Sequence, residues 1–570
     1  MQPRRLPVFR HKSHPHDANL LTNRRTFVRM HVPSAHGLHP TSTALPPGRD
    51  EPWRARWGVR ISGMSAAVVL CVAYLVIRPD SIDIASGLFR SQLFRRGVFF
   101  WNNEWFGGHP LPGYGVVSPA LNSLIGIQIA GVTSVLVGTW CFALLVERWR
   151  EHQPDLQSPE LAVVLFACST AANLWSGRLT FTPAIALGTA CLLATVRRRI
   201  GWAALLAALC GLASPVAALS LIVVLAAIWI ADSLPRRGTF MVAVATAVPI
   251  GILLVLFPEG GWYPFTGGSF ALLVVAVSVI GWYGRDLRVV RYGAIGYLLV
   301  ALAAFLIRSP LGGNVVRLGW VAAGALGALV IREHGRAAMA AFAVFTLIWG
   351  WSYARMGFTN AAPTAQAAYY TSLSDYLAAQ PGVFRVEVVP TPDYMQADTV
   401  ALRVGIARGW QTQIDRELNP EFYDGKLTSE AFRQWLQRDS VAFVALPLAA
   451  VQDKSQDEAL IVKSSPSYLR EVWSDANWIV YRVAGAQPLA DNGAQLLDVQ
   501  PESLTVQLTN AGATVVKFRY TDMYEVTGGD ACISATPEGW IRIDATTPST
   551  IRLQISALHH LAVGGQSNCA

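Results

Sequence analysis

Two aspartates stand directly after the first long apolar run of the sequence. Asp80 and Asp83 lie three residues apart, just beyond the apolar stretch 57–77, and they open a long connection over residues 78–118. A carboxylate at a membrane surface can take a proton from a sugar hydroxyl as a general base, or hold a divalent cation against a phosphate. The alternative is that both acids only solvate the end of a helix. We therefore treat Asp80 and Asp83 as candidate catalytic residues and leave the solvating role open.

The same connection carries further polar and aromatic side chains. Its segment 101–110 reads Trp-Asn-Asn-Glu-Trp-Phe-Gly-Gly-His-Pro. Connections of this length are usually functional. Glu104 and His109 are therefore candidates for an acceptor-binding or accessory role.

Three arginines lie at the ends of apolar runs that are otherwise poor in positive charge: Arg178, Arg308 and Arg317. A guanidinium group fits a phosphate in a bidentate way and stays charged at every relevant pH. The alternative for each is a side chain that extends along the helix to reach lipid headgroups. Because glycine-rich backbone flanks two of the three, the pattern favours binding of a lipid phosphate.

Aromatic and hydrogen-bonding side chains also meet in the polar C-terminal third. The segment 408–415 includes Trp410 and Asp415, and aromatic faces beside polar groups suit sugar rings. The other interpretation, a structural core with capping residues, has the greater weight. Trp410 and Asp415 are accordingly secondary candidates for acceptor binding.

The elements that must position these residues begin with a series of apolar runs. Of the 570 residues, 52% are hydrophobic and only 15% are charged, whereas soluble domains carry about 25% charged residues. A helix of about 20 residues crosses a hydrocarbon core of roughly 30 Å. The runs predict eleven membrane helices, near 57–77, 119–146, 159–175, 179–196, 200–213, 215–231, 239–257, 269–284, 289–307, 315–331 and 336–353. The division at Ala213–Pro215 is the weakest, since one kinked helix would also fit.

Alternate connections between the runs differ in charge. One set collects arginine, at 54–56, 148–150, 197–199, 236–237, 285–291 and 332–336. Since cytoplasmic ends collect Lys and Arg, this set is predicted to be inside the cell. The protein is then a multi-pass plasma-membrane protein whose N-terminus is cytoplasmic and whose C-terminal domain is extracytoplasmic.

The pattern divides the chain into four parts. Residues 1–52 are rich in Arg, His and Pro and predict a disordered basic tail. Residues 53–355 form the membrane domain. Residues 356–490 alternate helical stretches (369–379 and 429–438) with strand-like runs (384–389, 442–446 and 478–483), which predicts a small α/β domain. Residues 491–570 alternate polar and apolar residues at 504–508, 514–520, 540–544 and 551–555, which predicts a small antiparallel β-sandwich.

Charge and cysteine content follow the same division. Residues 356–570 hold 15 Lys and Arg against 23 Asp and Glu, while the preceding part is strongly basic. Five of the 7 cysteines lie in apolar runs, which leaves Cys532 and Cys569 in the acidic part. These two could form a disulfide in an oxidising compartment, or be two unrelated thiols.

Several function classes lack their motifs. The sequence has no Walker A glycine loop, no GxGxxG, no HExxH and no CxxC pair. Nucleotide-driven transport and zinc peptidase activity are therefore not expected. Nucleic-acid binding is not expected either, because the arginine-rich connections account for most of the basic charge.

This layout resembles the GT-C superfamily of integral membrane glycosyltransferases, and within it large actinobacterial membrane proteins and the YfhO-like branch. The resemblance covers residues 57–565 and is architectural. At residue level it involves Asp80 and Asp83, where the family keeps an acidic base or metal ligand, and the three arginines as phosphate contacts. The sequence departs from a common pattern in that the two acids are three apart rather than adjacent. A second acidic motif is absent from later loops unless Glu104 or Glu259 supplies it.

The resemblance implies inverting transfer of a sugar from a polyprenyl-phosphate donor to a cell-envelope glycan or lipid acceptor. Asp80 or Asp83 would take the acceptor proton, and the outer arginines would hold the donor phosphate. A divalent cation, Mg²⁺ or Mn²⁺, is the candidate cofactor, and membrane lipids are further partners. Two other classes stay open, namely a transporter or flippase of a lipid-linked glycan and a non-catalytic scaffold of envelope assembly.

Overall fold

The computed structural model describes residues 51–81, 83–258, 260–331, 335–352, 354–355 and 363–557. Residues 52–570 form one compact unit. The predicted basic tail 1–52 lies outside the described residues except for its last two positions, which begin the first helix. Glu259 also lies outside them.

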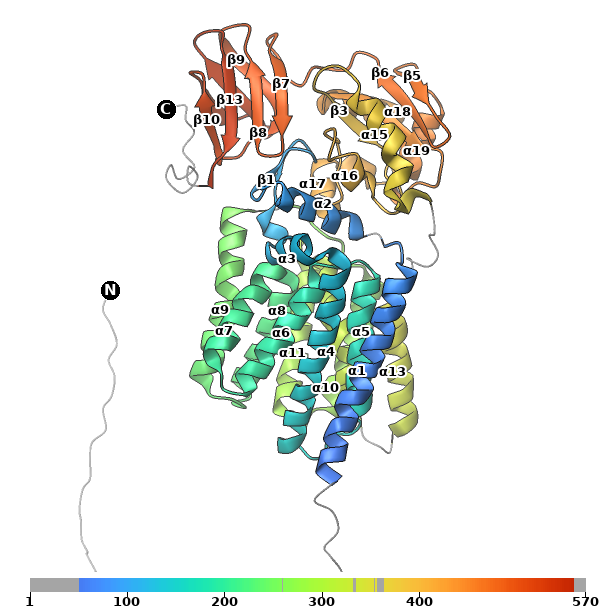
Figure 1. Ribbon diagram of the computed structural model, residues 1–570, viewed down its shortest axis with the longest axis vertical. Coiled ribbons are helices and arrows are strands. Elements are labelled where there is room, and N and C mark those ends of the chain that lie inside the picture. The colour runs from blue at the N-terminus through green and yellow to red at the C-terminus, as the bar shows by residue number, and fades with distance from the viewer. Residues whose placement is uncertain are drawn as a thin grey trace, which may run out of the picture. The chain divides into compact units, whose positions relative to one another are not determined.

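Within the described residues, eleven apolar helices make up the membrane part, the number that the sequence predicts. They are α1 (Glu51–Ile77), α4 (Ile127–His152), α5 (Pro159–Trp175), α6 (Phe181–Val196), α7 (Ile200–Ala213), α8 (Pro215–Ile230), α9 (Arg236–Leu256), α10 (Gly267–Tyr283), α11 (Arg288–Leu306), α12 (Arg317–Val330) and α13 (Arg336–Trp351) (Figure 1). Within the described residues, five helical stretches are long and apolar enough to cross a membrane, in α1, α4, α9, α11 and Gly312–Val330, and the other six are shorter. This composition identifies a membrane protein.

Two details of the predicted spans are settled by backbone geometry. The predicted span 119–146 is wrong as a single helix, because Gly126 adopts a φ of 83° between the short α3 (Val117–Ile125) and α4. The run around Pro215 forms two helices, since Ser214 is extended and its side chain caps the backbone amide of Ala217. Both breaks follow from residues that favour helix ends, glycine in the left-handed region and serine before proline.

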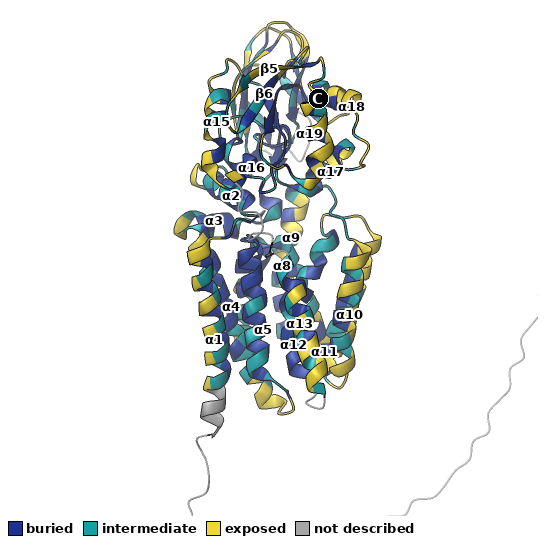
Figure 2. Ribbon diagram, turned by 90° about the vertical axis from the view of Figure 1, so that its right-hand side faces the viewer, coloured by how far each residue is buried: buried dark blue, intermediate teal, exposed yellow. Residues whose placement is uncertain are grey.

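Large apolar side chains on the outer faces of these helices are exposed. Val76 of α1 and Ile348 of α13 keep 77% and 67% of their surface. Figure 2 shows exposed residues along the outward face of α1, with the more deeply buried helices α4 and α5 beside it. Such apolar faces are stable in contact with lipid tails, because the tails are as apolar as the side chains themselves.

The connection over residues 78–118, called the first outer connection here after its predicted side, contains its own elements. These are α2 (Ile84–Arg95), β1 (Trp101–Asn102), β2 (His109–Pro110), the 3₁₀ turn η1 (Pro112–Tyr114) and α3. β1 and β2 pair antiparallel. The connection packs on the C-terminal parts of the chain: Trp105 is buried and donates from Nε1 to the Ala397 carbonyl (2.9 Å), while the Phe100 amide donates to Glu502 (2.6 Å).

The α/β part (residues 363–483) contains one mixed sheet of order β3-β4-β6-β5. Its strands are β3 (Arg385–Val388), β4 (Val441–Pro447), β5 (Leu469–Ser474) and β6 (Trp478–Val483), and only β3 and β4 pair in parallel. Its helices and turns are η4 (Pro363–Ala365), η5 (Ala367–Tyr370), α15 (Thr371–Ala378), α16 (Gln396–Thr399), α17 (Thr412–Leu418), η6 (Pro420–Phe422), α18 (Ser429–Arg438), η7 (Asp453–Ser455) and α19 (Gln456–Lys463). Every predicted strand and helix of this part is present.

Two antiparallel sheets form the β-sandwich (Gln495–Ile555). One has the order β10-β13-β8-β7 and the other β11-β12-β9. The strands are β7 (Gln495–Gln500), β8 (Ser503–Gln507), β9 (Gly512–Arg519), β10 (Tyr524–Gly528), β11 (Cys532–Ala535), β12 (Trp540–Ala545) and β13 (Thr550–Ile555). Alternating side chains of β8, β12 and β13 fill the core, among them Leu504, Ile543 and Leu553. The predicted fold class, a polytopic helical part followed by an α/β module and a β-sandwich, is therefore confirmed.

The oxidation state of the cysteines differs between the membrane part and the β-sandwich. The cysteines of the membrane part, Cys71, Cys141, Cys168, Cys191 and Cys210, are free. Cys532 at the start of β11 is disulfide-bonded. Its expected partner Cys569 lies outside the described residues, so the pairing of these two stays a prediction.

Candidate functional site

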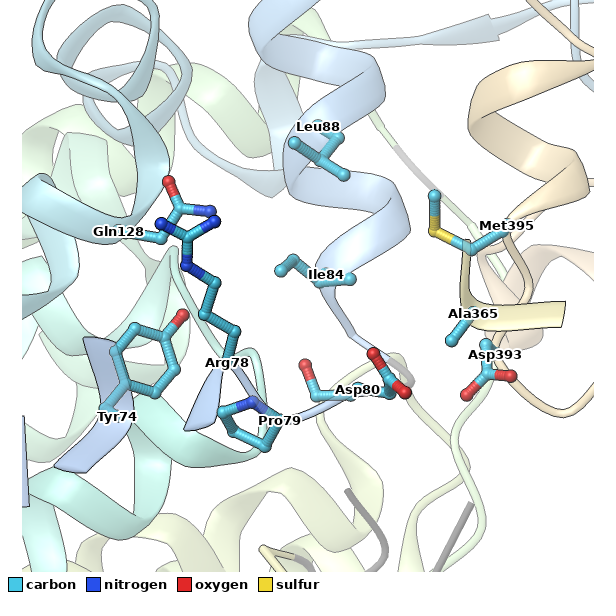
Figure 3. A pocket seen from close by; sticks show the side chains of 11 residues that line it. Tyr74, Arg78, Pro79, Asp80, Ile84, Leu88, Gln128, Ala365, Asp393 and Met395 are labelled. Carbon is cyan, nitrogen blue, oxygen red and sulfur yellow. The ribbon is translucent and has the colours of Figure 1, made fainter. Parts of the chain in front are cut away.

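A small open pocket lies where the first membrane helix ends. Its volume is about 120 Å³, and it is lined by Tyr74, Arg78, Pro79, Asp80, Ser81, Ile84, Leu88, Gln128, Ala365, Asp393 and Met395 (Figure 3). Asp80, one of the two predicted catalytic acids, is therefore a wall of this pocket. The other walls come from α1, α2, α4 and the α/β part.

The local sequence explains why Asp80 is directed here. The amide of Arg78 closes the last turn of α1 on the Tyr74 carbonyl (2.8 Å), and Arg78 itself has a φ of 49°. A residue before proline avoids the helical region, so Arg78 and Pro79 turn the chain away from the helix axis. Asp80 then stands at the membrane end of α1 with its carboxyl group half-buried, and this burial raises its pKa.

The second predicted acid, Asp83, is paired. It occupies the position before the first residue of α2, and its Oδ2 lies 3.4 Å from Nε of Arg178. The Arg178 guanidinium is buried and stacks over the Trp320 ring at 4.6 Å. Gly177, with a φ of 73°, makes this approach possible, because a side chain there would collide with Ser81. The structure thus joins Asp83 and one of the three predicted phosphate-binding arginines.

The other two arginines have different neighbours. Arg317 begins α12 and lies over the Phe181 ring at 5.4 Å, so it belongs to the same α6–α12 contact as Arg178 and Trp320. Arg308 is exposed and lies over the Trp262 ring at 5.3 Å, which it shares with Arg416 of α17. Of the predicted phosphate-binding set, Arg178 and Arg317 therefore lie in one region, while Arg308 is placed at the Trp262 loop.

A carboxylate that the sequence analysis did not single out completes the pocket. Asp393, in the loop between β3 and α16, is only 2% exposed. Its Oδ2 accepts a hydrogen bond from Thr364 Oγ1 (2.9 Å), and its Oδ1 has no hydrogen-bond partner among the described residues. Burial raises its pKa, and the nearby Asp80 carboxylate raises it further. The sequence around Asp393 gives no indication of this role. It becomes visible only in the fold, where this loop packs on the end of α1.

The side chains of Glu104 and His109 lie in the interior of the first outer connection. The His109 ring is buried and stacks on the Trp105 ring at 5.5 Å between centroids. Its Nε2 lies 3.1 Å from Nδ2 of the Asn102 side chain. Burial lowers the pKa of His109 to about 3, so the ring is neutral at physiological pH. Burial raises the pKa of Glu104 to about 8, while the positive charge of Arg96 opposes this rise. Neither residue lines the pocket that contains Asp80.

Trp410 and Asp415 also lie away from that pocket. Asp415 is 2% exposed, and its carboxylate accepts hydrogen bonds from Arg408 (2.8 Å), Asn419 (2.8 Å) and Tyr423 (2.5 Å). Trp410 meets Tyr114 of the first outer connection edge to face, at 5.9 Å between ring centroids. This geometry fits the structural alternative, in which the segment stabilises the α/β part.

The described residues contain no group of three or more His, Cys, Asp and Glu side chains that could hold a metal ion. The acids that the pocket brings together are two, Asp80 and Asp393. Magnesium needs only one or two protein carboxylates when water and phosphate oxygens supply its other ligands. The unpartnered oxygen of Asp393 therefore fits a divalent cation.

Comparisons with known proteins give similarity at the level of structure. The sequence matches no protein-family model and no curated protein. ArnT from Cupriavidus metallidurans bound to undecaprenyl phosphate is similar over 75% of this chain and 98% of that chain, with 14% sequence identity and a TM-score of 0.38. The archaeal oligosaccharyltransferase AglB from Archaeoglobus fulgidus, in complex with an inhibitory peptide and a dolichol-phosphate, is similar over 69% of this chain and 70% of that chain, with 11% identity and a TM-score of 0.43.

Proposed function

We propose that this protein is a membrane glycosyltransferase of the GT-C kind, which transfers a sugar from a polyprenyl-phosphate donor to a cell-envelope glycan or lipid at the outer face of the plasma membrane. The observation that carries the proposal is the pocket at the end of α1, where the half-buried Asp80 carboxylate stands at the membrane boundary. Asp83, on the segment that follows, is paired with Arg178, which lies between α5 and α6.

The reaction assigns one role to each group. Asp80 accepts the proton of an acceptor hydroxyl as its oxygen forms a bond to the anomeric carbon of the donor sugar. The bond between that carbon and the phosphate oxygen breaks with inversion, and polyprenyl phosphate leaves with the bonding electrons. Arg178 and Arg317 hold the leaving phosphate, although neither belongs to the lining of the pocket, whereas Arg308 lies apart at the Trp262 loop and has no part in this step. Asp80 suits the base because its raised pKa strengthens it as a proton acceptor.

Sidedness follows from the charge of the connections. The arginine-rich connections mark the cytoplasmic face, so the pocket, the α/β part and the β-sandwich are extracytoplasmic. The disulfide-bonded Cys532 agrees with an oxidising compartment on that side.

The test is sugar transfer by the purified full-length protein in lipid nanodiscs, with a panel of polyprenyl-phosphate sugars. We expect transfer from one donor, and we expect Asp80→Asn to lower kcat/KM by about 10²- to 10⁴-fold, the usual contribution of a general base. Asp375→Asn is the matched control, since Asp375 is an exposed acid of the α/β part paired with Arg403. Absence of transfer from every donor, or full transfer by the Asp80 variant, would refute the proposal.

A further inference from the structure

Two arginines from distant parts of the chain meet at one tryptophan ring. The guanidinium carbon of Arg308, in the connection between α11 and the 3₁₀ turn η2 (Gly312–Val316), lies 5.3 Å from the centre of the Trp262 ring. The guanidinium carbon of Arg416, in α17 of the α/β part, lies 5.2 Å from the same ring centre. Trp262 itself lies in the connection between α9 and α10. The membrane part and the α/β part therefore place two positive charges beside one aromatic side chain.

The backbone around Trp262 is fixed from both sides. The Trp262 amide donates to the Gln413 carbonyl of α17 (3.3 Å). The Tyr263 amide donates to the Ser309 carbonyl (3.0 Å), in the connection before η2. Gly261 has a φ of 74°, and a Cβ atom there would come within 2.2 Å of the Gln413 carbonyl oxygen. Close backbone packing between the two parts thus holds the tryptophan in place.

The two guanidinium groups have no acid to neutralise them. Neither Arg308 nor Arg416 forms an ion pair among the described residues, and Nε of Arg416 is buried without a hydrogen-bond partner there. The carboxylate of Asp415 accepts its hydrogen bonds within the α/β part. The carboxylate of Glu417 accepts one from the Gly261 amide. Like charges near one ring repel each other, so the arrangement favours a bound anion.

The arginine pair stands where an apolar surface of the membrane part ends. Leu306 and Ile307, directly before Arg308, keep 70% and 64% of their surface. Exposed aliphatic side chains of this kind contact acyl chains, and tryptophan is typical of the boundary between acyl chains and headgroups. A guanidinium group binds a phosphate through two parallel N–H bonds. An anionic phospholipid combines the acyl chains and the phosphate that this surface fits.

We propose that Arg308, Trp262 and Arg416 bind the headgroup of an anionic phospholipid in the leaflet next to the α/β part. The lipid phosphate lies against the two guanidinium groups, and the acyl chains follow the end of α11. This site is separate from the pocket that contains Asp80, because none of the three residues lines that pocket. Since each part supplies one arginine, the bound lipid links α17 to the membrane surface. Binding of the lipid does not depend on sugar transfer, so this inference and the proposed function can fail separately.

The test is amide hydrogen exchange of the full-length protein in phosphatidylcholine nanodiscs that contain increasing fractions of phosphatidylglycerol. We expect phosphatidylglycerol to slow the exchange of residues 260–266 and 412–418. Arg308→Gln and Arg416→Gln should each raise the phosphatidylglycerol fraction that gives half of this protection at least about fivefold, which corresponds to about 1 kcal/mol. Arg433→Gln is the matched control and should respond like the wild type, because Arg433 is an exposed arginine of α18 over a single tyrosine ring.

A second substitution keeps the test decisive if Arg416→Gln fails to fold. Arg308 is exposed, and Arg308→Lys retains its charge, so we expect protection between that of the wild type and that of Arg308→Gln. Equal exchange with and without phosphatidylglycerol, or a wild-type response of the folded Arg308→Gln protein, would overturn the inference. Equal protection by inorganic phosphate, or protection by polyprenyl phosphate alone, would overturn it as well. Protection by phosphatidylglycerol that needs both arginines, without sugar transfer from any donor, would uphold the lipid site and refute the proposed function.

Discussion

The two acids of the first outer connection differ in their surroundings, although they are only three residues apart. Asp80 opens onto a pocket, whereas Asp83 is engaged by the buried Arg178. The Asp83 carboxylate is occupied by its contact with Arg178, whereas an acceptor hydroxyl can reach Asp80 through the pocket. We therefore assign proton acceptance to Asp80 and positioning of Arg178 to Asp83.

This assignment predicts a loss of stability for Asp83→Asn. Removing the carboxylate takes a charge partner from Arg178, whose side chain is only 8% exposed. Breaking such a partly buried pair should lower the free energy of unfolding by about 1–2 kcal/mol, between the values for exposed and for fully buried pairs. Denaturant titration of the purified protein in detergent measures it. The control is Asp232→Asn, which breaks the exposed pair with Arg236 and should have no measurable effect.

A site residue can be predicted from the sequence when its signal lies in the neighbouring residues, as it does for Asp80, Asp83 and Arg178. Asp80 and Asp83 follow an apolar run that local composition reveals, and Arg178 breaks the charge bias of its side of the membrane. Asp393 gave no such signal, because its significance comes from a contact with a segment more than 300 residues away. Its neighbour Tyr394 adopts a φ of 53°, which no sequence pattern indicated.

At the scale of elements, the first outer connection packs between the membrane helices and the C-terminal parts. Phe89 of α2 stacks on Trp105 at 4.4 Å, and the Trp105 ring reaches the core of the α/β part. Gly409 lies against this ring, and a Cβ atom there would come within 2.8 Å of Trp105. The contact therefore requires the smallest side chain at position 409.

Gly409→Ala should consequently weaken the docking of this connection. Overpacking of a well-packed core costs about 1–3 kcal/mol, and we expect faster amide hydrogen exchange in residues 101–110. Gly405→Ala is the control, because a Cβ atom at Gly405 meets no atom within 4 Å and its change should stay within about 0.5 kcal/mol. Equal exchange rates in both variants would show that Gly409 is not a close contact.

Helices and strands with a clear sequence pattern were predicted well. The helix 429–438 and the strand 478–483 were predicted with the bounds that the structure has. The helix carries a regular apolar period, and the strand is a short run rich in aromatic and β-branched residues. The strands β5, β7, β10 and β11 were missed, since most of their side chains are exposed or half-buried and give no clear alternation. They belong to sheets whose formation depends on partners elsewhere in the chain.

At the scale of the whole molecule, titratable groups lie at the contact between the membrane and α/β parts. Burial raises the pKa of Asp398 to about 7 and that of Glu104 to about 8, and the nearby Arg96 opposes both shifts. Gln92 of α2 donates to Asp398 (3.0 Å), so this acid bridges the two parts. The folded protein therefore retains protons that the unfolded chain, with pKa values near 4, releases.

The sign of the resulting pH dependence is fixed by this difference. Between about pH 4 and pH 8 the folded state binds more protons than the unfolded state, so stability falls as the pH rises. We expect the melting temperature in nanodiscs to be at least about 3 °C lower at pH 8 than at pH 6, since 1 kcal/mol corresponds to a few degrees. The double variant Glu104→Gln, Asp398→Asn should show a flatter profile, because neither amide titrates. Glu430→Gln, at an exposed position of α18, should retain the wild-type slope, and a wild-type slope in the double variant would place the titrating groups elsewhere.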